Sequence, residues 1–221
     1  MNIIRISILS ILSLIAVTLP VISQTVVARY EFTGDSAAST DTDVSSVASD
    51  LTVGAGIPAL VYGQGNPNPG AFVDSTDISS SQANVLANNE YWEFSVTPTG
   101  SFNLTQLSFD HRSINNLGAG SSFFVRSSVD SFASDLASYA GGSFGWTERT
   151  VDLTGGGFDS LASVTFRLYG VSQFSILGRG FALDNVELQA NAVPEPSALI
   201  LSASALIILT FMRSRQYQRK P

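Results

Sequence analysis

The sequence predicts an all-β antiparallel sandwich between residues 24 and 192. Three observations predict it. The segment is rich in Ser, Gly, Thr, Phe and Val, its short apolar runs recur at intervals of roughly ten to twenty residues, and no long amphipathic helical pattern interrupts them. The clearest run contains Val164, Phe166 and Leu168 at alternate positions. This period of two is the one that a half-buried strand requires.

Seven strands are expected in chain order, each bounded by turn residues or a polar loop. They cover residues 25–32, 91–96, 102–111, 121–126, 147–153, 164–169 and 181–188. Between them, residues 34–50 and 63–70 are expected to form polar loops, and residues 132–139 a single helical turn. Long loops are unusual in a compact domain unless they carry a site or are partly mobile.

Residues 1–23 have the parts of a secretory signal peptide. Arg5 provides a positive start, residues 6–19 are uncharged and rich in Ile and Leu, and Pro20 breaks the apolar run. This order predicts export by the Sec machinery, with cleavage before Gln24. An uncleaved N-terminal anchor is the alternative.

The C-terminal residues 193–221 combine a proline motif, an apolar run and a basic tail. The motif is Val193, Pro194, Glu195 and Pro196, and the tail contains Arg213, Arg215, Arg219 and Lys220. Residues 197–212 between them carry no charge. A helix of this length is about 24 Å long, slightly short of the ~30 Å core of a bilayer. We expect a transmembrane helix whose C-terminal end is cytoplasmic, because cations gather on that side.

This three-part order resembles the PEP-CTERM sorting signal of Gram-negative bacteria. In that family an exosortase, which is a membrane cysteine protease, recognises the signal. The resemblance implies that Pro194, Glu195 and Pro196 are recognised residues of a substrate and not catalytic residues. It also implies an inner-membrane intermediate, followed by display at the cell surface or outer membrane or release into an exopolysaccharide matrix. On the residues alone, a plain C-terminal membrane anchor is the alternative.

Composition excludes several classes of function for residues 24–192. The segment has six arginines, no lysine and seventeen acids, so its surface repels phosphate and nucleic acid is not an expected partner. The chain contains no cysteine, and His111 is its single histidine. A cysteine nucleophile, an iron–sulfur cluster and a zinc site made of Cys and His side chains are therefore excluded within one chain.

Asp184 and Asn185 lie in a predicted strand, 181–188, that otherwise favours apolar residues. This strand resembles the last strand of jelly-roll modules of the carbohydrate-binding and galactose-binding type, in which the last strand lies near the first. Such modules often hold a structural calcium ion at this place, and the resemblance implies Glu31, Asp35 and Asp184 as candidate ligands. Carboxylate oxygens suit Ca²⁺. The alternative is an edge or turn residue bonded to the local backbone.

Aromatic side chains are the other candidate binding groups, because their faces suit the apolar faces of sugar rings. Trp146 borders a loop, and Trp146 and Tyr139 are the candidates for a carbohydrate platform. Trp92 shares a strand face with Phe94 and Val96 and is expected in the core.

No catalytic residue is predicted. His111 follows Asp110, but no serine lies in a Gly-x-Ser-x-Gly turn. Glu90 and Glu93 are three positions apart in one strand, so their side chains point to opposite faces and cannot flank one glycosidic bond. The sequence favours a non-catalytic binding or structural module with polysaccharide as the expected partner. A secreted glycan hydrolase and a plain membrane-anchored structural surface protein are the alternatives.

Overall fold

The computed structural model describes residues 24–63, 65–66, 73–76, 78–100, 102–114, 121–141, 144–172 and 180–192. These residues fall within one compact unit, Ser23–Val193. The predicted signal peptide and the predicted sorting signal, with its helix over 197–212, lie outside the described residues. In the described ranges, no helix is long and apolar enough to cross a membrane.

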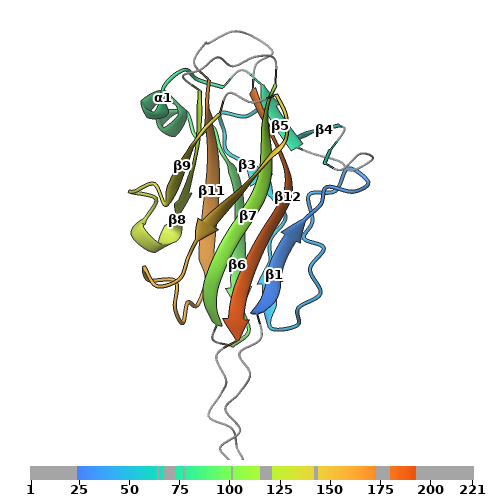
Figure 1. Cartoon of the computed structure of the whole chain (residues 1–221), viewed down its shortest axis with the longest axis vertical. Coiled ribbons are helices and arrows are strands. Elements are labelled where there is room, and N and C mark those ends of the chain that lie inside the picture. Colours follow the sequence, from blue (N-terminus) through green and yellow to red (C-terminus); the bar gives the residue numbers. More distant parts are fainter. Residues whose placement is uncertain are drawn as a thin grey trace, which may run out of the picture. The chain divides into compact units, whose positions relative to one another are not determined.

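Two antiparallel β-sheets pack face to face (Figure 1). Sheet A contains β1 (Gln24–Tyr30), β4 (Val61–Tyr62), β5 (Val73–Thr76), β7 (Phe102–Ile114), β10 (Thr147–Asp152) and β12 (Gly180–Ala192). Its order is β10-β7-β12-β5-β4, and β1 pairs with β12 beside β5. The predicted antiparallel sandwich is confirmed, and the last strand lies beside the first, as expected.

Sheet B faces sheet A across the core. It contains β2 (Ser46–Ala48), β3 (Thr52–Val53), β6 (Trp92–Pro98), β8 (Ser122–Ser127), β9 (Ala137–Ala140) and β11 (Val164–Val171). Its order is β2-β6-β11-β8-β9, and β3 pairs with β6 beside β2. Two short helices, α1 (Gln82–Ala87) and the 3-10 turn η2 (Ser128–Asp130), lie between strands.

The seven predicted strands are present, with ends that differ by a few residues. The strands that the sequence did not predict are β2, β3, β4, β5 and β9, which have two to four residues each and are too short to show a period. The helical turn predicted over 132–139 is wrong. The one-turn helix lies earlier, at η2, and residues 137–140 form β9, which pairs with β8.

Strand β12 changes its neighbour halfway along. Residues 180–183 pair with β5 and residues 186–191 pair with β1, while β7 follows β12 on the other side. Asp184 and Asn185 lie at the change, where the register against β7 shifts. Asn185 has a φ of 48°, in the left-handed region that Asn adopts more readily than most residues. Asp184 still pairs with Asp110, and Asn185 and Val186 together oppose the single residue Phe109 of β7, which makes a β-bulge.

The bulge moves two consecutive side chains away from the core. Leu183 and Val186 lie on either side of the pair Asp184 and Asn185, and both are fully buried between the sheets. Two residues separate these inward positions where regular alternation allows one. Asp184 and Asn185 therefore both lie toward the outer side of sheet A. This position explains why two consecutive polar residues interrupt an otherwise apolar strand.

The core between the sheets is largely aromatic, and Trp92 lies in it as predicted, with no exposed surface. Phe123 of β8 meets Phe109 of β7 at 5.2 Å and Phe181 of β12 at 5.7 Å between ring centroids. Gly170 of β11 has a packing role here. A Cβ at that position would lie 2.2 Å from the Phe181 ring, so only glycine lets the ring approach.

Candidate functional site

The outer face of sheet A carries a polar cavity of about 500 Å³. It is formed by β7, β10, β12 and the β4–β5 connection. Its lining residues, here called the polar trough, are Asn66, Gln106, Ser108, Phe109, Asp110, Glu148, Asn185, Glu187 and Gln189. The ring of Phe109 is buried in the core, so the trough is lined mainly by amide, hydroxyl and carboxylate groups without a basic side chain. This arrangement suits a ligand rich in hydrogen-bonding groups.

Three acids lie directly opposite one another across this face. Asp184 of β12 is the register partner of Asp110 in β7, and Asp110 is the partner of Glu148 in β10. Like charges in this arrangement destabilise a sheet. Burial raises the pKa of Asp184 to about 6, and the charges of Asp110 and Glu31 add to the increase. The row therefore carries less negative charge below about pH 6.

The side chains of Asp184 and Asn185 hold the backbone of Asn66. The Asn66 N–H donates to Asp184 Oδ2 at 2.6 Å, and Asn185 Nδ2 donates to the Asn66 carbonyl. Asp110 Oδ2 accepts from Asn185 Nδ2 at 2.7 Å and from Asn66 Nδ2 at 3.1 Å. These bonds compensate two carboxylates that are almost entirely withdrawn from water. They also fix one wall of the polar trough.

The proposed calcium ligands do not gather into a ligand set. Asp184 is buried and bonded to backbone N–H groups, whereas Glu31 and Asp35 are exposed. Across the part of the chain that the structure describes, no three His, Asp or Glu side chains form a group that could hold a metal ion. The carboxylate of Asp184 fits the alternative interpretation, a residue bonded to the local backbone.

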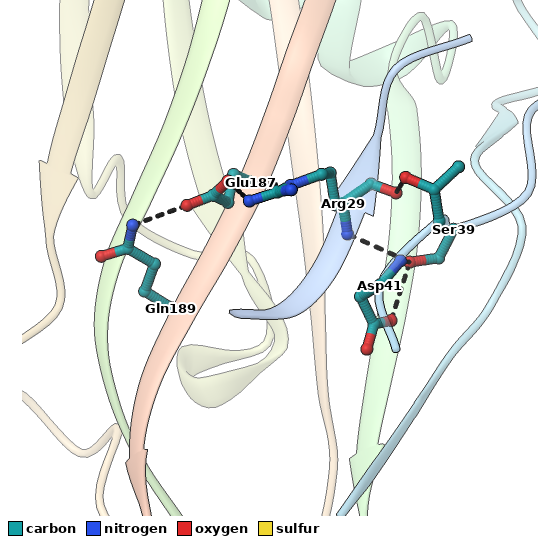
Figure 2. Close-up of polar contacts among 6 residues, drawn as sticks. Arg29, Ser39, Asp41, Glu187 and Gln189 are labelled. Atoms are coloured by element: carbon teal, nitrogen blue, oxygen red, sulfur yellow. Dashed lines mark hydrogen bonds and ion pairs between the residues drawn. The ribbon is translucent and has the colours of Figure 1, made fainter. Parts of the chain in front are cut away.

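Arg29 of β1 marks the border of the polar trough. Its Nε and Nη2 groups donate to Glu187 Oε2 at 3.0 and 2.6 Å, and Gln189 Nε2 donates to Glu187 Oε1 at 2.6 Å (Figure 2). Both carboxylate oxygens of Glu187 are thus engaged. Arg29 and Glu187 also line a cavity of about 240 Å³ together with Glu31 and Asn185.

A third cavity, of about 650 Å³, lies beside β1. Its lining residues, here called the edge cavity, are Gln24, Thr25, Val26, Arg29, Thr40, Asp41, Thr42, Asp43 and Val44. Ser39 Oγ accepts from the Arg29 N–H at 3.0 Å and donates to Asp41 Oδ2 at 2.9 Å (Figure 2). The Thr40 N–H also donates to the Arg29 carbonyl, at 2.7 Å. These bonds fix the wall of the cavity against the edge of β1.

The aromatic candidates lie outside these cavities. The Arg112 guanidinium is 4.8 Å from the centre of the Trp146 ring, and the Arg149 guanidinium is 5.0 Å from the centre of the Tyr139 ring. Tyr139 Oη also donates to the carbonyl of Thr150 at 2.8 Å. Neither Trp146 nor Tyr139 lines the polar trough or the edge cavity. Each ring has an arginine against one face, which leaves less aromatic surface for a sugar.

Sequence reasoning missed the polar trough, although a signal for it was present. In β7, Gln106, Ser108 and Asp110 alternate with buried residues, and in β12 Glu187 and Gln189 do the same. The alternation identifies an outward polar face. It does not show that the two strands are neighbours.

Comparisons with known proteins find similar β-sandwiches among solved structures. No family model and no curated protein matches the chain. The K3 cleaved adhesin domain of Lys-gingipain from Porphyromonas gingivalis is 14% identical with a TM-score of 0.41, over 76% of this chain and 99% of that one. The CBM27-1 module of Caldicellulosiruptor saccharolyticus, in complex with mannohexaose, is 11% identical with a TM-score of 0.40, over 75% and 96%.

A family 11 carbohydrate-binding module from Clostridium thermocellum, in complex with a β-1,3-1,4-mixed-linked tetrasaccharide, is 14% identical with a TM-score of 0.36, over 76% of this chain and 95% of that one. The two-sheet sandwich of this chain is similar in fold to these carbohydrate-binding modules and to this adhesin domain. At these identities and TM-scores the likeness carries no argument about a ligand. Any argument about a ligand rests on the cavities described above.

Proposed function

We propose that this protein is an exported, non-catalytic β-sandwich of the jelly-roll type that binds a polysaccharide chain in the polar trough. The observation that carries the proposal is the lining of the trough. Amides such as Gln106 and Gln189 offer both donors and acceptors, and the exposed carboxylate of Glu148 accepts, which matches the hydroxyl groups of sugars. The groups stand on paired strands, so little ordering is needed when a ligand binds.

A glycan hydrolase is the second candidate, because three acids line the trough. Hydrolysis requires two carboxyl groups, roughly 5 to 10 Å apart, on either side of the scissile bond. Asp110 is bonded to two side-chain amides and Glu187 to Arg29 and a glutamine, so both serve as fixed acceptors. Asp184, whose pKa is raised to about 6, does not line the trough. These contacts favour binding over hydrolysis.

Affinity electrophoresis tests the binding proposal. We expect slower migration of the exported domain in gels containing soluble β-glucan, mannan or xylan. Ser108→Trp fills the trough and abolishes the retardation, whereas Ser138→Trp, at an exposed position of β9 in sheet B, leaves it unchanged. Equal retardation of both variants, or none of the wild type in any gel, contradicts the proposal. If the wild type releases reducing sugar and Asp110→Asn does not, the protein is a hydrolase instead.

The proposed destination is supported by the two ends of the sequence. Residues 1–23 direct Sec export. Residues 197–212 then hold the protein in the inner membrane as an intermediate, and the PEP-CTERM-like segment directs processing by the exosortase. The product is then displayed on the surface of a Gram-negative cell or released into its polysaccharide matrix.

Mass spectrometry of the product from a host that contains an exosortase tests the destination. We expect a C-terminus near the proline motif, and an intact chain when Glu195 is replaced by Ala. A wild-type product that still ends at Pro221 indicates a plain membrane anchor.

A further inference from the structure

We infer that the ligand path does not end at the polar trough but continues past the Arg29–Glu187 pair into the edge cavity, so that the module binds an extended, uncharged glycan chain across the strands. The inference rests on the proposed function and names its ligand class.

Shared lining residues connect the three cavities. The polar trough and the small cavity share Asn185 and Glu187, and the small cavity and the edge cavity share Arg29. The two shared side chains at the borders between the cavities, Arg29 and Glu187, form an ion pair with each other. A ligand can therefore pass from one cavity to the next without crossing another strand or loop. The three cavities therefore form one polar path with a salt bridge at its middle.

The path runs across the strands rather than along them. Arg29, Glu187 and Ser108 are successive register partners in β1, β12 and β7, and Ser108 is the partner of Thr150 in β10. With strands about 4.8 Å apart, the distance from β1 to β10 is about 14 Å, and the edge cavity extends the path further. A monosaccharide cannot occupy both ends of such a path, whereas a polysaccharide chain can.

Arg29 is suited to contact a ligand at the junction. Two of its nitrogens donate to Glu187, its Nη1 makes no hydrogen bond among the described residues, and its side chain is 41% exposed. The bond to Glu187 fixes the guanidinium plane, so Nη1 is a positioned donor for a sugar hydroxyl.

The charges along the path exclude acidic glycans. Asp110 and Glu148 line the trough, Glu31 the small cavity, and Asp41 and Asp43 the edge cavity. The positive charge at the junction is compensated by Glu187. Hydrogen bonds from the hydroxyls of Ser45 and Thr25 lower the pKa of Asp43, so its charge persists in mild acid. A uronic acid chain is repelled along the whole path, whereas a neutral chain is not.

Isothermal titration calorimetry with cellohexaose, mannohexaose and xylohexaose, their disaccharides and hexagalacturonate tests the inference. We expect at least one neutral hexasaccharide to bind about tenfold or more tightly than its disaccharide, and no binding of hexagalacturonate. Thr42→Trp fills the edge cavity and removes the advantage of the longer chain while the disaccharide affinity stays unchanged. Thr97→Trp, at an exposed position of β6 in sheet B, is the matched control for folding and has no effect.

The outcomes separate the two proposals. If a hexasaccharide and its disaccharide bind equally, or Thr42→Trp retains the full affinity for the longer chain, the extended path is wrong and the binding function stands. Binding of hexagalacturonate as tight as that of the neutral chains contradicts the charge selection. If neither the neutral oligosaccharides nor their parent polysaccharides bind, the proposed function fails and the extended path fails with it.

Discussion

Asp110 and His111 are neighbours in β7, yet they belong to opposite faces of sheet A. Asp110 points outward and is bonded to the amides of Asn66 and Asn185. His111 points inward, has no exposed surface, and stacks on Phe123 with 5.1 Å between ring centroids. The outer face thus gathers polar groups that can meet a ligand, and the inner face gathers rings that hold the sheets together.

The same physical cause acts on ionisable groups of both faces. Burial raises the pKa of Asp184 to about 6 on the outer side. Burial, together with the charge of Arg149, lowers the pKa of His111 to about 4 on the inner side. In each case burial favours the neutral form, which raises the pKa of an acid and lowers the pKa of a base. The two faces should therefore respond to acid with opposite signs.

The largest expected effect is the loss of a core ring. Phe123 is fully buried and lies within 6.1 Å of the ring centroids of Trp92, Phe109, His111 and Phe181. We expect Phe123→Ala to lower the free energy of unfolding by about 3–5 kcal/mol. Ser108→Ala in the trough should change it by less than about 0.5 kcal/mol. Urea unfolding followed by tryptophan fluorescence measures both, and similar values for the two variants contradict the division between the faces.

The next effect is the acid sensitivity caused by His111. Unfolded His111 takes up a proton near pH 6.5, whereas folded His111 does so near pH 4, so stability falls as the pH decreases through this window. The loss approaches about 3 kcal/mol at the acid end. In His111→Phe this loss should be absent, although the bond from Arg149 Nε is lost at every pH. Urea unfolding at several pH values between 7 and 4 tests this, and parallel pH curves for wild type and variant contradict it.

Asp184 gives the opposite, somewhat smaller effect. Its folded pKa, about 6, lies above the unfolded value of 3.8, so its contribution to stability is largest below pH 3.8 and is lost as the pH rises through 6. Acidification from pH 7 to 4 therefore stabilises the wild type at this site, by about 2 kcal/mol. In Asp184→Asn the gain disappears, and the variant should lose more stability in acid than the wild type does. The same urea series at each pH compares wild type and variant. The double variant Asp184→Asn/His111→Phe lacks both groups, so its stability should depend little on pH between 7 and 4.

The smallest expected effect concerns the junction of the ligand path. Arg29 and Glu187 form a partly exposed ion pair, with 41% and 21% of their side-chain surfaces accessible. Such pairs contribute less than about 1 kcal/mol, so Arg29→Gln should barely change the midpoint of thermal unfolding. Its affinity for a neutral hexasaccharide should nevertheless decrease several-fold. A variant that loses stability and affinity together would place Arg29 in the fold rather than in ligand binding.

The long strands could be predicted from the sequence because their side chains alternate over many residues. The run from Val164 to Leu168 is the clearest case, and Trp92 was correctly placed in the core. Short strands such as Thr52–Val53 have no period and form only because β6 offers an edge. The ends of the chain, with the sorting motif at Pro194, Glu195 and Pro196, stay predictions because they lie outside the described residues.

The candidate site was harder to predict, because it depends on register between strands that are distant in sequence. The anomaly at Asp184 and Asn185 was visible, and it marks the bulge. Its partners were not visible: Asn66 comes from a loop 118 positions earlier, and Asp110 comes from β7. Because these amides and backbone groups could not be seen in the sequence, the resemblance to jelly-roll modules implied a calcium ligand at Asp184.

NMR mapping of the bound surface shows whether a glycan binds in the polar trough. A ¹⁵N-labelled exported domain is titrated with the neutral hexasaccharides. We expect shifts for the backbone amides of four residues on the outer face of sheet A, Gln106, Ser108, Glu187 and Gln189, and unchanged signals for β9 in sheet B. Shifts that gather on sheet B or around Trp146, or saturable binding without any shift in the polar trough, would contradict it.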